Sequence, residues 1–443
     1  MPAIPSLPER IYGFLAEDED ARVCKDIPAD ACDEQPRSFV LQLAALTLTR
    51  LGDTIMSPRL VLAWMLATLG APAMFVAFLV PLRESFALLP QLLVAQRLRE
   101  YPRRKYFWVA GALGQAAALG GMTAAALFLE GAALGWSVVL ALSVFSLARG
   151  VCSVAAKDVL GKTVSRTRRG RLTGNAAAAA GAATLLVAMG LILFPEMDGS
   201  RGVFALLLAG AMLLWILAAL LYARVPESAG ATQGGGNAFR EALRSLGLLV
   251  HDRRFAAFVG ARALLVATAF AIPYLVVLVQ RASESAAAVP ESTTLGAMLF
   301  ASGLAALLGG AAWGKFADRA ANRTMAAGAL LSVLAMAAAL LLHALRPDWL
   351  RTETAAALLL FAATVAHHGV RIGRQTYLVD MATGETRAQY VAVSNTVMGF
   401  VLLSGLSLGV LDHAAGVVAV LLLLAGVGMA AAACCWRLPD VSG

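Results

Sequence analysis

A small number of ionisable side chains lie inside long apolar stretches of this 443-residue chain. A charged group at the centre of a bilayer-spanning helix costs roughly 2.5–3.5 kcal/mol, so such groups are rare unless they have a role. A carboxylate there can exchange a proton, and an arginine can bind an anion or hold a carboxylate. The candidates for proton coupling or ligand binding are Asp53, Glu84, Arg50, Arg83, Arg149, His367, His368, Arg371 and Arg262.

The spacing of these residues predicts which of them can meet. Arg50 and Asp53 are three residues apart and would share one helix face. Arg83 and Glu84 are adjacent and would point about 100° apart, so they need different partners. We expect Arg50, Asp53, Arg83, Glu84 and Arg149 to form a charge-paired network at mid-depth, in which Asp53 or Glu84 exchanges a proton. The alternative is that these charges pair only to hold the helices in register.

The remaining candidates allow a structural interpretation as well. His367 and His368 are adjacent, so we expect at most one of them to face a shared cavity, and hydrogen-bonded packing is the alternative for either. Arg262 lies only a turn or two inside its apolar stretch. A long side chain in that position can extend to the membrane surface, and this is the conformation we expect.

Motifs for catalysis or metal binding are missing from the apolar stretches and their flanks. There is no His-x-x-x-His pair, no Cys–His pair, no nucleophile motif and no Gly-x-x-x-x-Gly-Lys-Ser/Thr loop. We therefore expect no enzyme activity, no metal and no cofactor. The five cysteines lack zinc-ligand spacing, and we expect them to be reduced and unpaired.

The apolar stretches themselves predict the elements that position the charges. The chain is 59% hydrophobic and 14% charged, and its apolar residues come in continuous blocks. Blocks of about 20 residues fit a hydrocarbon core of about 30 Å as helices. The sequence predicts an all-α polytopic membrane protein with twelve spans, at 41–66, 71–95, 106–128, 136–157, 173–194, 203–223, 256–279, 294–313, 324–344, 354–376, 390–411 and 415–436.

The loops between these spans predict the orientation of the chain. Lys and Arg concentrate in alternate loops, as in the run from Arg97 to Lys105 and again in the run from Lys162 to Arg171. Since basic loops stay in the cytoplasm, both termini should be cytoplasmic. The formal charge of +8 then reflects orientation, not nucleic-acid binding. The first 37 residues carry nine acids and four bases, which excludes a secretory signal peptide. We expect the lipid bilayer of a bacterial-type cytoplasmic (inner) membrane.

The chain divides into two similar halves. Arg149 precedes Asp158 by nine residues, and Arg371 precedes Asp380 by nine, with the two pairs 222 positions apart (371 minus 149). Such a repeat predicts two pseudo-symmetric six-helix bundles. We divide the chain into an acidic cytoplasmic segment at 1–37, a first bundle at 38–224, a cytoplasmic linker with an amphipathic helix at 225–255, and a second bundle at 256–437.

Two groups of six spans joined by a central loop resemble the major facilitator superfamily. The loop after the eighth span carries the clearest match, to the family's Gly-x-x-x-Asp-Arg signature and its basic pair, in Gly314, Asp318, Arg319 and Arg323. The copy after the second span is degenerate, with Ala95 in place of the glycine. Arg149 matches the arginine of the family's span-4 motif. The resemblance covers about 38–437.

The resemblance implies a cavity lined by spans 1, 4, 7 and 10, with spans 3, 6, 9 and 12 facing lipid. The charges follow this division, because they lie in spans 1, 2, 4, 7 and 10, while span 9 has only His343 at its end. The resemblance further implies salt-bridge latches that close the cytoplasmic side. The predicted gate comprises Gly314, Asp318, Arg319, Arg323, Asp158, Asp380, Arg103 and Arg104. If Asp380 and Arg319 form such a latch, charge-swap substitutions at the two positions should rescue each other.

The function that the resemblance implies is secondary active transport by alternating access. We expect a small organic solute, anionic or zwitterionic because arginines exceed carboxylates, and coupling to protons in a chain that works as a monomer. The alternatives are an uncoupled facilitator, a multidrug-type exporter, and a sensor or scaffold on the same fold. The fifth span lacks the Gly-Pro motif of drug–proton antiporters, which argues against the exporter.

Overall fold

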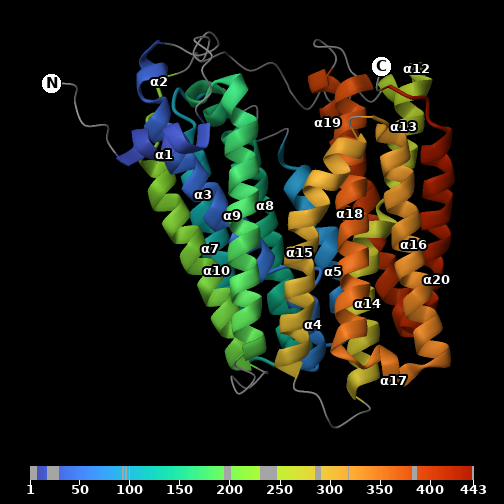
Figure 1. The fold of residues 1–443 in the computed structure, drawn as a ribbon. Helices are drawn as coiled ribbons and strands as arrows, with labels where there is room; N and C mark the ends of the chain where they lie inside the picture. The colour runs from blue at the N-terminus through green and yellow to red at the C-terminus, as the bar shows by residue number, and fades with distance from the viewer. Residues whose placement is uncertain are drawn as a thin grey trace.

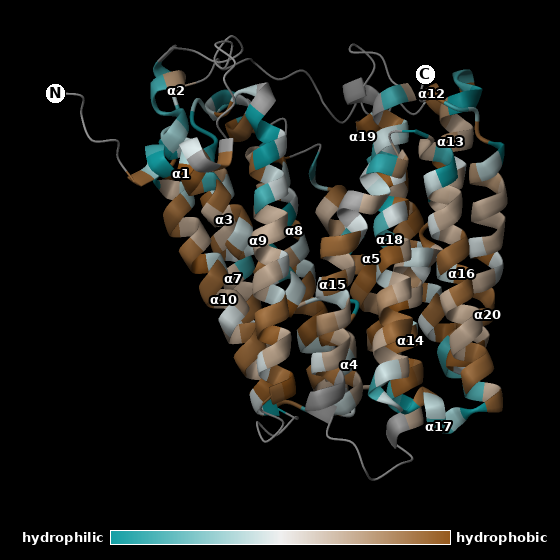
Figure 2. Ribbon diagram, viewed as in Figure 1, coloured by the Kyte–Doolittle hydropathy of each residue, from teal (hydrophilic) through white to brown (hydrophobic). Residues whose placement is uncertain are grey.

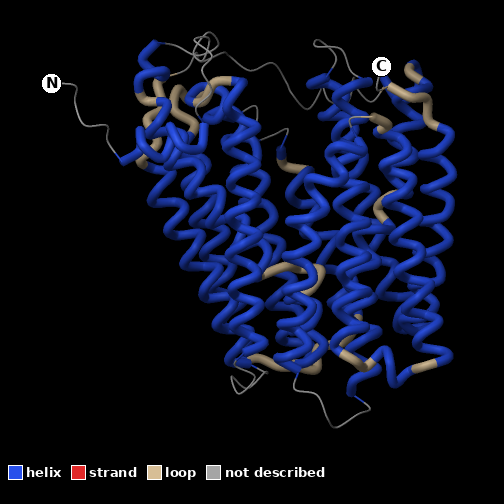
Figure 3. Tube along the Cα trace, viewed as in Figure 1, coloured by secondary structure: helices blue, strands red, loops and turns tan. Residues whose placement is uncertain are grey.

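The computed structural model describes residues 7–16, 29–91, 94, 97, 98, 100–193, 201–229, 247–284, 291–317, 319–381 and 387–441. Within these ranges all regular structure is helical (Figure 3). Eight helical ranges are long and apolar enough to cross a membrane, judged by length and composition. Hydrophobic residues cover the long helices, and hydrophilic residues gather toward their ends (Figure 2). The all-helical membrane fold is therefore confirmed, while the count of twelve spans stays a prediction.

The first half begins with a predicted span that is divided in two by a helix break. Residues 56–60 separate α3 from α4, and Pro58 lies in this break because proline cannot donate a helical hydrogen bond. The helices of this half are α3 (Gln35–Ile55), α4 (Val61–Thr68), α5 (Met74–Leu88), α7 (Lys105–Phe128), α8 (Gly131–Thr163), α9 (Arg166–Leu193) and α10 (Arg201–Ala223).

The second half has a corresponding series with two interruptions. Gly416 has a φ of 79° inside α20, and the two helical runs that meet there match the predicted boundary between spans 11 and 12. The helices are α12 (Leu248–His251), α13 (Arg253–Leu264), α14 (Ala267–Glu284), α15 (Glu291–Ala317), α16 (Ala321–Leu345), α17 (Pro347–Leu350), α18 (Glu353–Met381), α19 (Arg387–Leu403), η1 (Ser404–Leu406) and α20 (Ser407–Arg437).

The two halves repeat one close helix contact, which supports the predicted duplication. A Cβ on Gly111 of α7 would lie 2.8 Å from the carbonyl oxygen of Ala148 on α8. A Cβ on Gly328 of α16 would lie 2.9 Å from the carbonyl oxygen of Ala366 on α18. The glycines are 217 positions apart and the carbonyls 218 (328 minus 111, 366 minus 148). In both halves a glycine therefore lets the third span press against the backbone of the fourth.

The halves join most closely at one end of the molecule. Helices α1 (Leu7–Ala16), α2 (Ala29–Asp33) and α12 lie at the end that we call the α1 end, and α17 lies at the opposite α17 end (Figure 1). Near the α17 end, Gln280 Nε2 of α14 donates to the Thr68 hydroxyl at 2.6 Å and to the Trp64 carbonyl at 3.2 Å on α4. Helix α9 packs on α15, and α5 packs on α19 and α20.

The amino-terminal segment packs against the first bundle. Tyr12 of α1 (Leu7–Ala16) contacts Phe39 edge to face, with ring centroids 5.3 Å apart, and Gln35 Nε2 donates to the Tyr12 hydroxyl at 2.6 Å. Cys32 is disulfide-bonded to a residue outside the described ranges, so the expectation of unpaired cysteines is wrong there. A disulfide depends on how closely the backbone approaches itself, which ligand spacing does not reveal.

The predicted domain boundaries stay predictions. Most of the expected amphipathic helix in the 225–255 linker lies outside the described residues, since the structure describes 225–229 and then resumes at 247. The described end of the linker contains α12, followed by Asp252. The Asp252 carboxylate accepts from the Phe255 backbone N–H at 2.9 Å and caps α13.

Candidate functional site

A cavity of about 420 Å³ lies between the two halves. The first half contributes residues from α3, α5, α8 and the break before α4, and the second half contributes mainly α18, together with α14 and α15. The charged side chains that line it are Asp53, Glu84, Arg59, Arg83, Arg149, Arg371 and Arg374.

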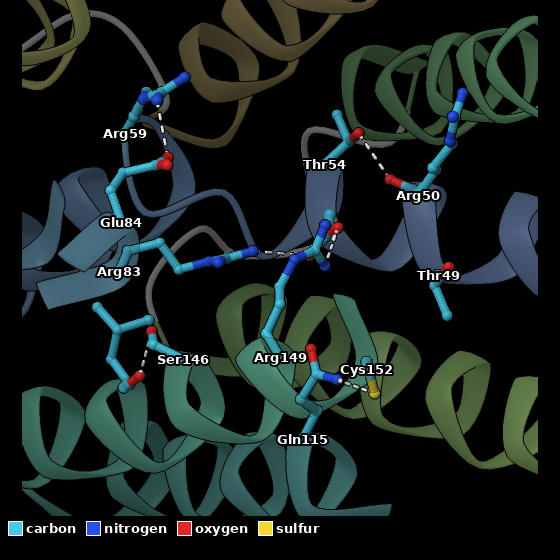
Figure 4. Close-up of polar contacts among 12 residues, drawn as sticks. Thr49, Arg50, Thr54, Arg59, Arg83, Glu84, Gln115, Ser146, Arg149 and Cys152 are labelled. Carbon is cyan, nitrogen blue, oxygen red and sulfur yellow. Dashed lines mark hydrogen bonds and ion pairs between the residues drawn. The ribbon is translucent and has the colours of Figure 1, made fainter. Parts of the chain in front are cut away.

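Asp53 holds two arginines from two other helices. Its Oδ1 accepts from Arg83 Nη2 of α5 at 3.2 Å, and its Oδ2 pairs with Arg149 of α8. Each guanidinium also lies over an aromatic ring: Arg83 is 5.1 Å from the ring centroid of Phe145, and Arg149 is 5.9 Å from that of Trp215. Asp53, Arg83 and Arg149, which we call the Asp53 cluster, therefore connect α3, α5 and α8. Figure 4 shows the side chains of Arg83 and Arg149 extending toward each other.

Glu84 has a partner that the sequence analysis did not include among its candidates. Arg59, in the break after α3, donates through Nη2 to Glu84 Oε1 at 2.9 Å. Arg83 and Glu84 thus have different partners, as their adjacency requires. Arg50 instead donates to the Thr173 carbonyl on α9 at 2.8 Å. The expected five-residue network is therefore two separate groups, with Arg50 bonded elsewhere.

Helix α18 supplies the other side of the cavity. His367, His368, Arg371 and Arg374 all line it, so the expectation that at most one histidine faces it is wrong. Adjacent side chains differ by about 100°, and a cavity that extends around part of a helix can contact both. Arg371 and Arg374 are one turn apart, and neither forms an ion pair within the described part of the chain. Arg374 was not among the predicted site residues.

The cavity is strongly cationic. Its lining has five arginines against two carboxylates, an excess of three positive charges when the histidines are neutral. Arg371 and Arg374 contribute to this excess without forming an ion pair with any described carboxylate. Guanidinium groups bind carboxylates and phosphates through paired hydrogen bonds, so this arrangement favours an anionic ligand.

Arg262 is buried, and the expectation that it reaches the surface is wrong. Only 8% of the residue is exposed, and its guanidinium bonds to the Ser394 hydroxyl and, at 3.0 Å, to Asn395 Oδ1 of α19. Arg50 in the first half bonds Thr173 in a similar way, and these acceptors are 222 positions apart (395 minus 173). The first span of each half therefore uses an arginine to hold the fifth, which the depth of Arg262 alone could not reveal.

Two of the predicted gate residues, Asp158 and Arg104, lie together in the first half. Asp158 at the end of α8 pairs with Arg104 and, at 2.9 Å, with Lys162. Lys162 also lies 3.2 Å from Glu227, which follows α10. The buried Glu227 carboxylate accepts the backbone N–H groups of Arg104 and Lys105 at the start of α7. Glu227 was not predicted, since nothing in its local sequence marks it as a cap for a distant helix.

The other predicted gate residues have less defined surroundings. Arg103, Arg319 and Asp380 are exposed, and Asp318 lies outside the described residues. The Arg323 guanidinium lies 6.0 Å from the ring centroid of Trp436. A Cβ on Gly314 would meet no atom within 4 Å. A latch between Asp380 and Arg319 stays a prediction.

This all-helical fold of two halves is also found in solved structures of transporters. No protein-family model matches the sequence, and no curated protein matches it. Solved structures do: a mutant of the nucleoside transporter NupG has a TM-score of 0.69 at 14% identity, covering 90% of this chain and 99% of that one. A POT family transporter in complex with a thioalcohol-conjugated peptide has a TM-score of 0.67 at 12% identity, covering 92% of this chain and 97% of that one. A D-xylose-proton symporter has a TM-score of 0.65 at 13% identity, covering 91% of this chain and 98% of that one.

These likenesses confirm the fold that the sequence predicts. The chain has the fold of major facilitator transporters over 90% or more of its length in all three comparisons. Sequence identities of 12–14% establish the shared fold and do not identify the solute.

Proposed function

We propose that this chain is a proton-coupled secondary transporter of a small organic anion. The observation that carries the proposal is the cavity between the halves, with its excess of three positive charges and its two carboxylates. The solved structures of similar fold are those of transporters, which supports transport over catalysis. An anionic solute would give Arg371 and Arg374 a direct partner, since neither forms an ion pair with a described carboxylate.

Coupling follows from competition for arginines. A solute anion that draws Arg59 toward itself weakens the Arg59–Glu84 pair, which is 2.9 Å long. A carboxylate that loses its cationic partner binds a proton more readily. Glu84 therefore takes up a proton as the anion binds, and the two move together. Asp53 holds two arginines at once and needs a larger rearrangement before it can be protonated.

The arrangement of the halves fits one state of an alternating-access cycle. Gln280 connects α14 to α4 near the α17 end, whereas the paired residues at the α1 end, such as Asp158 and Arg104, lie within one half. We infer that the cavity in this state is reached from the α1 end. The opposite state requires the bonds from Gln280 to Thr68 and Trp64 to break.

The test is uptake by the purified chain in proteoliposomes. Labelled monocarboxylates, dicarboxylates and phosphate monoesters would be supplied outside, with and without an inward proton gradient. We expect accumulation of at least one class only with the gradient. Glu84→Gln should abolish the gradient dependence, whereas Glu130→Gln, whose carboxylate is exposed and paired with Arg201, should transport normally.

The other outcomes identify the alternatives. Equilibration without a gradient effect would indicate an uncoupled facilitator, and export of lipophilic cations would indicate a multidrug-type exporter. Anion binding without translocation would indicate a sensor on this fold. An unchanged gradient dependence in both Glu84→Gln and Asp53→Asn would refute the coupling proposal.

A further inference from the structure

A second, smaller cavity of about 80 Å³ lies beside the main one. The two cavities share Arg59, Glu84, His367 and Arg374, so the small cavity is a side chamber of the large one. Its further polar residue is Arg262, and the rest of its lining is apolar, including Leu265 and Met398. We call it the Arg262 chamber.

The charges of the Arg262 chamber are not balanced. Three arginines face one glutamate, and Glu84 is already paired with Arg59. No described carboxylate pairs with Arg262 or Arg374. A guanidinium stays charged in proteins, so Arg262 cannot avoid this imbalance by losing its proton.

Arg262 also has unused hydrogen-bonding capacity. Its hydrogen-bond partners are two neutral side chains, Ser394 and Asn395, and among the described residues its Nε has no partner although the residue is 92% buried. A buried charge without a counter-charge destabilises a protein. A residue kept in this condition beside a cavity fits a site that a ligand completes.

We propose that the Arg262 chamber is a subsite for one small oxyanion group, a carboxylate or a phosphate, held between Arg262 and Arg374. The inference rests on the proposed function, because the group would be the charged end of the transported solute. A volume of 80 Å³ exceeds the roughly 10–15 Å³ that one water needs and leaves room for one such group. The larger cavity would hold the remainder of the solute.

The apolar lining makes the subsite selective. The side chains of Leu265, Val266 and Met398 offer no hydrogen-bond partners. A neutral hydroxyl or amide that enters the chamber therefore gives up its bonds to water, and the two arginines bind it less strongly than they bind an anion. Neutral analogues of a solute should therefore bind weakly. The same lining excludes water around the ion pair, which strengthens its attraction.

The experiment measures anion binding separately from transport. The detergent-purified chain would be titrated with sodium acetate or sodium phosphate, each replacing sodium chloride at constant ionic strength, because chloride has no pair of oxygen atoms to accept the two parallel hydrogen bonds of a guanidinium. Calorimetry and thermal unfolding would follow wild type, Arg262→Met, Arg262→Lys, Arg374→Met and the control Arg201→Met. Arg201 pairs with the exposed Glu130, far from the chamber in sequence and on α10.

We expect acetate or phosphate to bind wild type and the control equally. The loss of charge-assisted bonds in Arg262→Met should weaken binding by roughly 10- to 100-fold. Arg374→Met should have a similar effect, and Arg262→Lys a smaller one. Because Arg262→Met removes an uncompensated buried charge, it should also raise the unfolding temperature without anion, a change that a purely structural arginine would not produce.

Two outcomes overturn the inference. One is that neither anion binds wild type. The other is that Arg262→Met binds both anions as well as wild type does, which would place the anion in the main cavity alone. If phosphate binds but only carboxylates are transported, the subsite accepts inorganic phosphate as a free ion, and the charged end of the transported solute is a carboxylate. Anion binding at Arg262 without any transport would refute the proposed function and leave the subsite standing.

Discussion

Replacement of Asp53 by asparagine should destabilise the chain measurably. Asp53 is the one carboxylate in direct contact with both Arg83 and Arg149. The three side chains are between 12% and 33% exposed, so the cluster is mostly buried. Asparagine is similar in shape and leaves two arginines close together with no counter-charge between them.

The magnitude follows from the contacts that are lost. Each hydrogen bond to a charged group contributes about 1.5–3 kcal/mol, and removal of one partner of a fully buried pair costs about 3–5 kcal/mol. Because water reaches part of this cluster, we expect a cost near the lower limit, about 3 kcal/mol. For a chain longer than 250 residues, each kcal/mol shifts the unfolding temperature by roughly 2 °C or less, so we expect about 5 °C.

The assay is thermal unfolding of the detergent-purified protein, arranged as a double-mutant cycle. Asp53→Asn and Arg149→Gln would be measured singly and together, with Glu130→Gln as the exposed control. The second change should recover part of the stability lost in the first, because it removes the repulsion between Arg83 and Arg149. An unchanged unfolding temperature in Asp53→Asn, or strictly additive effects in the cycle, would refute this account of the cluster.

Three further changes test other contacts by thermal unfolding. Asp158→Asn should cost about 1.5–3 kcal/mol, because it loses a charge-assisted bond to Arg104 and the two side chains are only 27% and 13% exposed, and no change would show that the pair contributes nothing. The Tyr390 hydroxyl bond lowers the pKa of Asp252, so this carboxylate stabilises the fold above its unfolded pKa and less as pH falls through its folded pKa. Tyr390→Phe should therefore cost more stability at pH 7 than at a pH below the folded pKa of Asp252, and a pH-independent loss would contradict this. Gly328→Ala should cost about 1–3 kcal/mol, since the new Cβ meets backbone atoms of α18 at 2.9 Å, and a neutral effect would disprove the tight packing.

The sequence predicts the fold because the relevant signals are local. Continuous apolar blocks define helices, and the predicted division between 411 and 415 falls beside Gly416, where the backbone turns. The gathering of charges around one cavity could also be predicted. A charge inside a membrane is stable only beside other polar groups, so Asp53, Glu84 and Arg149 had to meet somewhere.

The choice of partners could not be predicted in the same way. Estimates of depth place residues along a helix but leave open its rotation and its breaks. The helix break at 56–60 places Arg59 within bonding distance of Glu84. The packing of α13 on α19 places Arg262 beside Ser394, so its side chain does not extend to the surface. Glu227 caps a helix that begins 122 positions earlier (227 minus 105), and no local pattern encodes such a contact.

The two halves keep a common frame but distribute charge differently. An arginine of the first span holds the fifth in each half, through Arg50 and Arg262. In the first half the cavity carboxylates Asp53 and Glu84 form ion pairs with arginines, whereas the arginines of α18 form no ion pair with a described carboxylate. Under the proposed function this asymmetry gives the two halves different roles. The second half holds the anion and the first half holds the proton, so a monoanion bound with one proton leaves the excess of three positive charges unchanged, whereas a dianion bound with one proton lowers it to two. Since a charged cavity resists the apolar surroundings that close over it, a dianion should lower the cost of the conformational change more than a monoanion does.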